Sequence, residues 1–170
     1  MPTIFKPGML QFKEGPFNRP PFGLLTAMPY LCKQANANRL VFDVRKLPPR
    51  QYSFPFHYHR SAEEVMLVIE GSMKLRTPQG FEVVNQGDIL YFETGESGAH
   101  QFFNHTGSPC TYFDVKTYCG MDVVVYPDSG KIMISHYDEV FELEKQADYF
   151  KDEENVGDKW KDAACDSAAD

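Results

Sequence analysis

Residues 57–71 read HYHRSAEEVMLVIEG, and this stretch decides the fold of the chain. In an extended strand successive side chains alternate sides, so His57 and His59 point to one face while Phe56 and Tyr58 point to the other. At a rise of roughly 3.3 Å per residue, the two imidazoles lie about 7 Å apart along the strand, close enough to bind one ion. Taken alone, this His-x-His pair also fits two surface histidines on an edge strand, so a metal site needs further support.

A second strand begins directly after this pair. Glu64 opens it, and its carboxylate can reach the same ion. The run that follows, Val65–Ile69, has apolar side chains on both faces. A strand of this kind is covered on both sides. One face is therefore expected to line a barrel interior, and the other to meet a second sheet or another subunit.

From residue 39 onward, short β-branched and aromatic segments alternate with turn signals. The segment at residues 40–47 ends at Pro48-Pro49, and a hairpin is expected around Pro78-Gln79-Gly80. A spacing of roughly 8–12 residues between strands is typical of an all-β sandwich or barrel. Because the His-x-His unit occurs once, the chain does not contain two duplicated barrels. We predict one barrel over residues 39–136, with strands that include 40–47, 55–59, 64–70 and 89–92.

Three segments lie outside this barrel. Residues 1–38 are rich in Pro and Gly, which predicts an irregular N-terminal arm with one or two short strands. In residues 137–150 apolar side chains recur at helical spacing, which predicts a short C-terminal helix packed on the barrel. Residues 151–170 are predicted to form an acidic, disordered tail.

The charge of the chain is unevenly distributed. Its 24 acidic and 17 basic side chains give a net charge of −7, and residues 138–170 hold 12 of the acids but only 4 of the bases. The remaining 12 acids and 13 bases leave the body nearly neutral. Without a basic stripe we expect no nucleic-acid partner. Without an apolar run of roughly 20 residues we expect no membrane partner.

The cysteines and the first residues indicate a cellular compartment. Cys32, Cys110, Cys119 and Cys165 follow no metal-ligand spacing. The first ten residues lack the apolar core of a signal peptide. Together these features favour free thiols in a reducing cytoplasm.

The stretch around the two histidines resembles the first motif of the cupin superfamily. That motif reads Gly, five residues, His-x-His, three or four residues, Glu, six residues, Gly. His57, His59, Glu64 and Gly71 match its latter part, whereas Gln51 replaces the opening Gly.

A later stretch resembles the second motif of the same superfamily, which reads Gly, five residues, Pro-x-Gly, two residues, His, three residues, Asn. Gly87, Gly95, His100 and Asn104 match it. Glu93 replaces the Pro, and four residues instead of two separate Gly95 from His100.

The resemblance implies an all-β fold with a single jelly-roll barrel. It also implies one divalent transition metal held by His57, His59, Glu64 and His100. Three imidazoles and one carboxylate suit Fe, Mn, Ni, Zn or Cu. Four protein ligands on an octahedral ion leave two positions open, which is typical of a site that binds substrate or dioxygen.

Other residues near the motifs have less specific interpretations. Glu63 points to the opposite face of its strand and is expected to face solvent. His105 lies an odd number of residues from His100 and is expected, like His136, at the surface or at an interface. Asn104 is expected to hold backbone in place.

Two apolar residues share faces with the expected ligands. Met66 lies on the face of Glu64, and Phe102 lies on the face of His100. We expect both to line a substrate pocket, although ordinary core residues would show the same pattern.

These features favour a metal-dependent enzyme that acts on a small organic molecule. Oxygenase, decarboxylase, isomerase and lyase chemistry all fit the four ligands, because a fold and its ligand set do not fix the reaction. The catalytic residues stay unassigned. The alternative is a non-catalytic cupin that binds or senses a small molecule. The second apolar face of the strand at 64–70 favours a homodimer.

Overall fold

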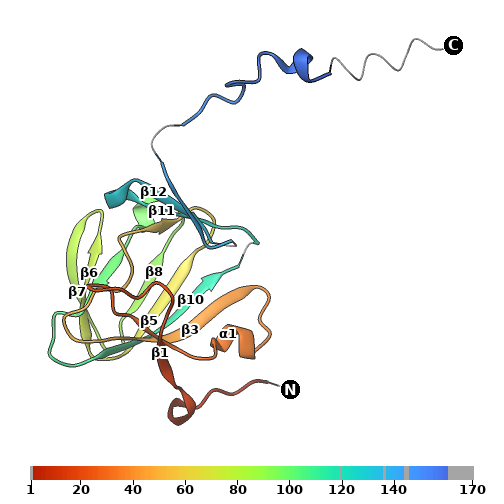
Figure 1. Ribbon diagram of the computed structural model, residues 1–170. Coiled ribbons are helices and arrows are strands. Elements are labelled where there is room, and N and C mark those ends of the chain that lie inside the picture. Colours follow the sequence, from red (N-terminus) through yellow and green to blue (C-terminus); the bar gives the residue numbers. More distant parts are fainter. Residues whose placement is uncertain (1, 119, 136, 144–145, 161–170) are drawn as a thin grey trace.

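The computed structural model describes residues 2–118, 120–135, 137–143 and 146–160. Its described strands pair antiparallel in three sheets, and the buried apolar side chains form a main core and a smaller cluster around Phe56 and Tyr58 (Figure 1). The largest sheet has the order β1 (Phe12–Glu14), β2 (Leu25–Ala27), β3 (Leu40–Leu47), β10 (Cys110–Thr117), β5 (Glu64–Glu70) and β8 (Ile89–Phe92). The second has the order β13 (Glu139–Glu142), β12 (Lys131–Ile134), β11 (Val123–Tyr126) and β4 (Tyr58–His59). The third has the order β7 (Gly80–Asn85), β6 (Ser72–Thr77) and β9 (Gln101–Phe103).

The helical elements are short. They are α1 (Leu31–Gln34) and the 3₁₀ turns η1 (Pro7–Met9), η2 (Glu96–Gly98), η3 (Pro127–Ser129) and η4 (Val156–Trp160). The predicted all-β jelly-roll fold is therefore confirmed, with helices only in connections and flanking segments of the described chain.

Several predicted strands have the expected bounds. β3, β5 and β8 begin and end where the sequence pattern places them. β6 and β7 join through Pro78-Gln79, since Thr77 pairs with Gly80. β4 is shorter than the strand predicted at 55–59, and His57 joins the sheets through an isolated bridge.

The alternation along β5 separates an inner from an outer face. Its even-numbered side chains from Glu64 to Val68 are buried, whereas Val65, Leu67 and Ile69 are 37–42% exposed. The inner face packs into the main core, as predicted. The outer face is left open by the described part of this chain, so the cover expected there stays a prediction.

The N-terminal arm is fixed to the barrel by backbone pairing. β1 and β2 extend the largest sheet beyond β3, in agreement with the one or two short strands predicted in this segment. α1 was not predicted, and its first backbone N–H, at Leu31, donates to Oδ1 of Asp43 on β3 at 2.8 Å. Gln51, at the position of the first cupin Gly, packs so closely on Gly23 that a Cβ there would lie 2.9 Å from its side chain.

Replacing Asp43 with asparagine is expected to stabilise the protein above pH 6. Burial raises the pKa of Asp43 to about 6, from 3.8, although the Leu31 N–H opposes the shift. The folded state therefore holds this proton more tightly than the unfolded chain, and the carboxylate costs stability as the pH rises through this window. Asparagine keeps the acceptor for Leu31 without the charge. We expect a gain of about 1–3 kcal/mol at pH 7.5 and almost none at pH 4.

Denaturant unfolding of both proteins at the two pH values measures this difference. Asp88→Asn is the matched control, because Asp88 also accepts a backbone hydrogen bond, from Asn85, but lies in an exposed turn. A loss of stability in the Asp43 variant at pH 7.5 would show that its charge is needed next to Arg45.

The helix predicted at residues 137–150 is wrong in the part that the structure describes. Glu139–Glu142 form β13, which pairs with β12 in register from Ile134↔Glu139 to Lys131↔Glu142. Asp138 adopts a left-handed backbone with φ of 54°, which is a turn conformation and interrupts any helix that would begin before it. The free edge of β12 then provides hydrogen-bond partners for the backbone of residues 139–142.

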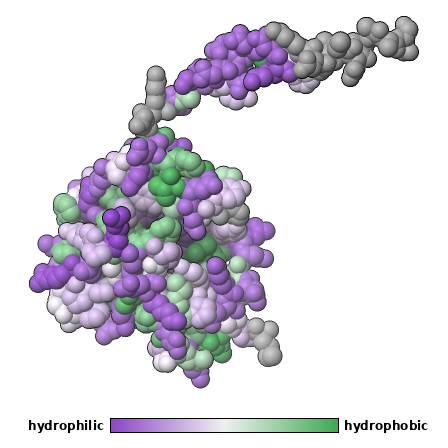
Figure 2. Space-filling model, in the orientation of Figure 1, coloured by the Kyte–Doolittle hydropathy of each residue, from purple (hydrophilic) through white to green (hydrophobic). Residues whose placement is uncertain are grey.

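The segment after this hairpin is exposed. Every residue from 146 to 160 has an exposed surface, and Figure 2 shows the segment as mostly hydrophilic and separate from the barrel. The rest of the predicted tail, at 161–170, lies outside the described residues, so the prediction of disorder stays a prediction. Among the described residues, no helix has the length and apolarity that crossing a bilayer requires.

Candidate metal site

Two chain segments bring the predicted ligands together. His57 and His100 form an isolated bridge in which the His100 N–H donates to His57 O at 2.9 Å and the His57 N–H donates to His100 O at 3.2 Å. His59 lies in β4, and Glu64 is the first residue of β5. All four side chains are buried, at 2–7% exposure. The two motifs therefore meet at one place inside the barrel.

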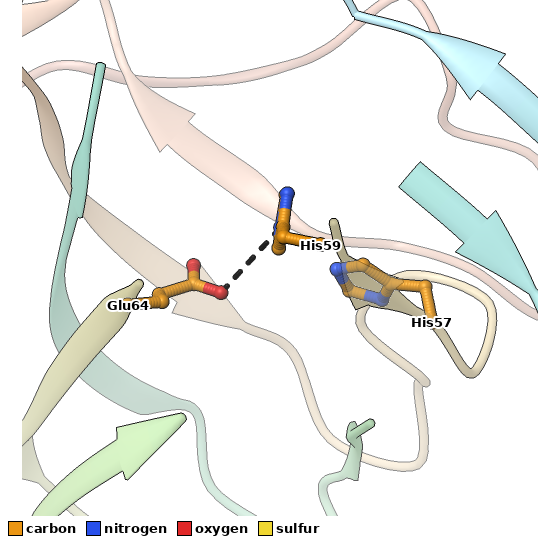
Figure 3. Close-up of side chains that lie close together, drawn as sticks. All are labelled: His57, His59 and Glu64. Carbon is orange, nitrogen blue, oxygen red and sulfur yellow. Dashed lines mark ion pairs between the residues drawn. The ribbon is translucent and has the colours of Figure 1, made fainter. Parts of the chain in front are cut away.

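The predicted ligand atoms face one another. One ligand atom each from His57, His59 and Glu64 lies within 4.8 Å of the others (Figure 3). Glu64 Oε2 is 3.7 Å from His59 Nε2 and 3.4 Å from His100 Nε2. The rings of His57 and His100 have centroids 4.7 Å apart. The first three residues could hold a metal ion, and His100 lies at the same centre.

Hydrogen bonds fix the orientation of each ring. The three Nδ1–H groups donate to oxygens on the outer side of the site, and this leaves Nε2 of each ring free. Such outer partners are common for metal-binding histidines, since they fix the tautomer and the ring plane. The pairs are His57 with Pro55 O at 2.8 Å, His59 with Asp122 Oδ2 at 2.5 Å and His100 with Gly98 O at 3.0 Å.

One atom at the centre of the site has no hydrogen-bond partner. Glu64 Oε2 is buried and unpaired among the described residues. A buried carboxylate oxygen without a donor is costly, and the groups that face it are Nε2 atoms that carry no proton when Nδ1 does. A cation between these atoms would satisfy all of them. The residues present therefore fit a divalent metal.

Burial keeps the imidazoles of His57 and His100 neutral. Desolvation, followed by repulsion from His100 and His59, lowers the pKa of His57 well below its usual value. Desolvation also lowers the pKa of His100 to about 4. A metal ligand must offer a lone pair, so both rings are ready to bind an ion at neutral pH.

The carboxylates respond to their surroundings in opposite ways. Desolvation and the neighbouring Asp114 raise the pKa of Glu64 well above its usual value. A bound cation would reverse this shift by favouring the ionised form. Burial also acts to raise the pKa of Asp122, but the hydrogen bonds from His59 and from the Ser61 N–H lower it below its usual value.

Sequence reasoning missed the charged residues that surround the ligands. Asp114 forms an ion pair with Arg45, which also donates to Thr26 Oγ1 at 3.1 Å and lies over the ring of Phe54. Asp122 directly precedes β11 and accepts the hydrogen bond from His59 Nδ1–H. The strand pattern predicts which residues point inward, and it places Arg45 and Asp114 on inner faces, but it does not reveal that they meet.

A cavity of about 110 Å³ lies against the four candidate ligands. Met66 and Phe102 line it, as the sequence predicts, although their contact with a substrate stays a prediction. Its further lining combines apolar walls with six polar side chains, namely Arg45, Ser53, Tyr112, Asp114, Lys116 and Tyr126. The cavity can hold a small molecule next to an ion.

The remaining motif residues lie outside this centre. Glu63 accepts a hydrogen bond from Tyr91 OH at 2.7 Å on the exposed side of the sheet, as its position in the strand predicts. Asn104 is fully buried and donates to the carbonyls of Leu47 and Ser108 at 2.8 Å, so it does hold backbone in place. His105 is half-buried, and no contact with the candidate ligands is found for it among the described residues. His136 lies outside the described residues.

Comparisons with known proteins agree with this geometry. Residues 44–116 match the sequence model of the family described as cupin domain. None of the curated proteins matches the chain. A solved structure described as a sugar phosphate isomerase of the cupin superfamily, from Silicibacter pomeroyi, has a TM-score of 0.72 at 20% identity, over 82% of this chain and 92% of that one.

The polyketide cyclase RemF from Streptomyces resistomycificus has a TM-score of 0.54 at 22% identity, over 69% of this chain and 80% of that one. At such identities the likeness concerns the fold. The matched segment 44–116 contains both motifs, and the structure brings them together at one buried centre. On this evidence residues 44–116 form a cupin domain, and the fold of the chain is similar to that of a cupin-superfamily structure.

Proposed function

We propose that this protein is a metal-dependent enzyme that acts on a small organic molecule. His57, His59, Glu64 and His100 hold one divalent transition metal, either Fe, Mn, Ni, Zn or Cu. The observation that carries this proposal is the unpaired Glu64 Oε2, which faces Nε2 atoms whose rings are fixed through Nδ1. Such an arrangement is costly without a cation and favourable with one.

The surroundings of the site suit catalysis. A bound ion of this kind polarises a carbonyl, hydroxyl or carboxylate of a substrate, or activates dioxygen. The chain contributes apolar walls, among them Met66 and Phe102, which exclude water from the ligand sphere. Asp114 forms an ion pair with Arg45 and a side-chain hydrogen bond with Glu64, and it thereby positions the Glu64 carboxyl group. The described sugar phosphate isomerase shares this fold, so isomerisation is the first of the four reaction types to test.

Metal content tests the proposal directly. Elemental analysis of freshly purified protein is expected to find about one transition-metal ion per chain, and a chelator-treated sample is expected to take up one ion on titration. Because burial lowers the pKa of His57 and His100, protons should compete with the ion mainly below the usual imidazole pKa of about 6.5. Protein that contains no metal and binds none would refute the proposal. A retained small molecule that is never turned over would favour a binding or sensor role.

We also propose that the protein acts in the cytoplasm. Cys110 is buried and free, and Cys32 is free and half-buried. Thiols that stay reduced are typical of proteins in a reducing compartment. Cys119 and Cys165 lie outside the described residues.

A second copy of the chain is the proposed cover for the outer face of β5 and β8. This face presents Val65, Leu67, Ile69, Ile89 and Tyr91, which are 37–73% exposed. They form one continuous surface, because Val65 pairs with Tyr91 and Leu67 with Ile89. A two-fold axis brings the same apolar surface of two copies together, which is the commonest arrangement of homodimers.

Replacing Leu67 with aspartate is expected to turn this dimer into a monomer. The charge would be buried without a partner at the centre of the interface, which weakens association by roughly 100-fold or more. Light scattering coupled to size-exclusion chromatography measures the mass. Phe81→Asp is the control, because Phe81 is 77% exposed but lies on β7 in another sheet. A monomeric wild-type protein would contradict the proposed dimer.

A further inference from the structure

Lys116 is a cation inside the site that the proposed ligand set does not use. It lies on β10 directly opposite Glu64, and its half-buried side chain lines the cavity that holds the candidate ligands. Facing positions of this kind often form ion pairs. Among the described residues, however, none forms a hydrogen bond or an ion pair with the Lys116 ammonium. Its side chain also borders a second cavity, together with Val41 and Asp122, and its charge has no contact partner in the part of the chain that the structure describes.

The other cation of the cavity is already neutralised. Arg45 pairs with Asp114 and donates to Thr26 Oγ1. Arg45 therefore stabilises the wall of the site, while Lys116 remains available to a ligand. The two basic residues differ in role although they lie on neighbouring strands.

The position of Lys116 is unfavourable for a metal site that has no further ligand. Its positive charge acts on His57, His100, Glu64 and Asp114 and, through them, on any ion that they hold. A divalent ion together with Lys116 and Arg45 carries four positive charges. Glu64, Asp114 and Asp122, together with Asp43 next to Arg45, carry at most four negative charges. Arg45 has its carboxylate in Asp114, whereas Lys116 has no such partner among the described residues, so an anion next to Lys116 is favoured in a cavity of low dielectric.

We propose that Lys116 binds an oxyanion group of the substrate, a carboxylate or a phosphate, next to the metal. This inference rests on the proposed function and names its substrate class. Tyr126 supplies a second donor, because its ring lies 6.0 Å from that of His57. Within the described part of the chain, its hydroxyl has one hydrogen-bond contact, with the weak acceptor Met133 Sδ at 3.8 Å. Burial raises the pKa of Tyr126 to about 12, so this hydroxyl keeps its proton at neutral pH.

The size of the cavity limits what lies inside it. A dry cavity of about 150 Å³ accommodates benzene. The cavity at this site, at about 110 Å³, admits a group somewhat smaller than a six-carbon ring. A carboxylate or phosphate head group with one or two attached atoms meets this limit, and the rest of a longer substrate would extend toward the surface.

Binding of simple anions tests the role of Lys116 without any assay of turnover. Malonate, inorganic phosphate and the neutral malonamide are titrated calorimetrically into the protein with its metal and into chelator-treated protein. We expect malonate, phosphate or both to bind the wild type, and Lys116→Met to weaken this binding about 10- to 100-fold. Lys116→Arg should restore most of it. Malonamide should bind at least about 10-fold more weakly than malonate and should not respond to Lys116→Met.

The controls separate charge from folding. Lys13→Met removes an exposed lysine on β1 and is expected to bind the anions like the wild type. Thermal unfolding checks that Lys116→Met is folded. If it is not, the anion affinity of Lys116→Arg, which keeps the positive charge, is compared with that of the wild type instead. Binding of malonate alone identifies a carboxylate site, and binding of phosphate alone identifies a phosphate site.

Three results would overturn the proposal. They are a wild type that binds neither anion, equal anion binding by the wild type and Lys116→Met, and malonamide binding as tight as that of malonate. The metal titration distinguishes failure of the anion site from failure of the proposed function. If the protein takes up no metal but its metal-free form binds anions through Lys116, the metal proposal fails and the anion site stands.

Discussion

Glu64→Gln is expected to lose metal binding and yet fold at least as stably as the wild type without metal. The substitution removes the one anionic ligand of the site, and because even outer-sphere partners change metal affinity roughly 10- to 100-fold, we expect a loss of more than about 100-fold. In the metal-free protein the same carboxylate is buried, has an unpaired Oε2, and lies next to Asp114. An amide has the same shape, carries no charge and can donate a hydrogen bond to Asp114.

Two measurements on the same samples check this prediction. Titration with a divalent metal gives the affinity, and thermal unfolding with and without chelator gives the stability. The wild type should gain stability on metal addition, because a ligand that binds only the folded state stabilises it. The variant should gain almost none. A variant that binds metal like the wild type would remove Glu64 from the ligand set.

The neighbouring residue provides a matched control. Glu63→Gln makes the same chemical change one residue earlier, where the side chain points to the outer face and accepts a hydrogen bond from Tyr91. Its metal affinity should equal that of the wild type. If both variants lose metal to the same extent, a general effect of charge or folding explains the result better than direct coordination does.

The contrast between these two glutamates shows what the sequence predicts well. Strand alternation separates Glu63 from Glu64 and places Met66 toward the inside, because the period of a strand is fixed by its geometry. The same reasoning predicts the bounds of β3, β5 and β8. Strong apolar patterns bounded by Pro and Gly decide these elements locally, and tertiary structure does not override them.

The surroundings of the site could not be predicted in the same way. Asp122 is 63 residues away from His59, and Arg45 is 69 residues away from Asp114. These contacts depend on which strands are neighbours and on the register in which they pair. The residue pattern within a single strand predicts neither of these. Lys116 illustrates the point, since its interest comes from its place opposite Glu64 on β10. The helix predicted at 137–150 is wrong at residues 139–142 for a related reason, because the free edge of β12 outweighed the helical spacing.

The loop before His100 differs from the usual cupin motif, and the structure shows how the difference is absorbed. The extra residues between Gly95 and His100 form the 3₁₀ turn η2, which is closed by the Gly98 N–H donating to Gly95 O at 3.1 Å. Gly98 is buried, and a Cβ on it would lie 1.9 Å from the carbonyl oxygen of Glu93. Glu93 occupies the position of the motif's Pro, so its backbone lies directly against the turn that orients His100.

Gly98→Ala is therefore expected to damage both the fold and the metal site. A methyl group at 1.9 Å from a backbone oxygen cannot be accommodated by a side-chain rotation, so the turn has to move, at a cost of about 2–4 kcal/mol. The Gly98 carbonyl accepts the hydrogen bond from His100 Nδ1, so the imidazole would turn away from Glu64 and metal affinity would fall by about 10-fold or more.

Denaturant unfolding and metal titration measure the two effects. Gly107→Ala is the matched control, because a Cβ there meets no atom within 4 Å and both measurements should stay near wild type. Since the two variants add the same methyl group, an equally stable Gly98→Ala protein with unchanged metal affinity would mean that this turn does not position His100.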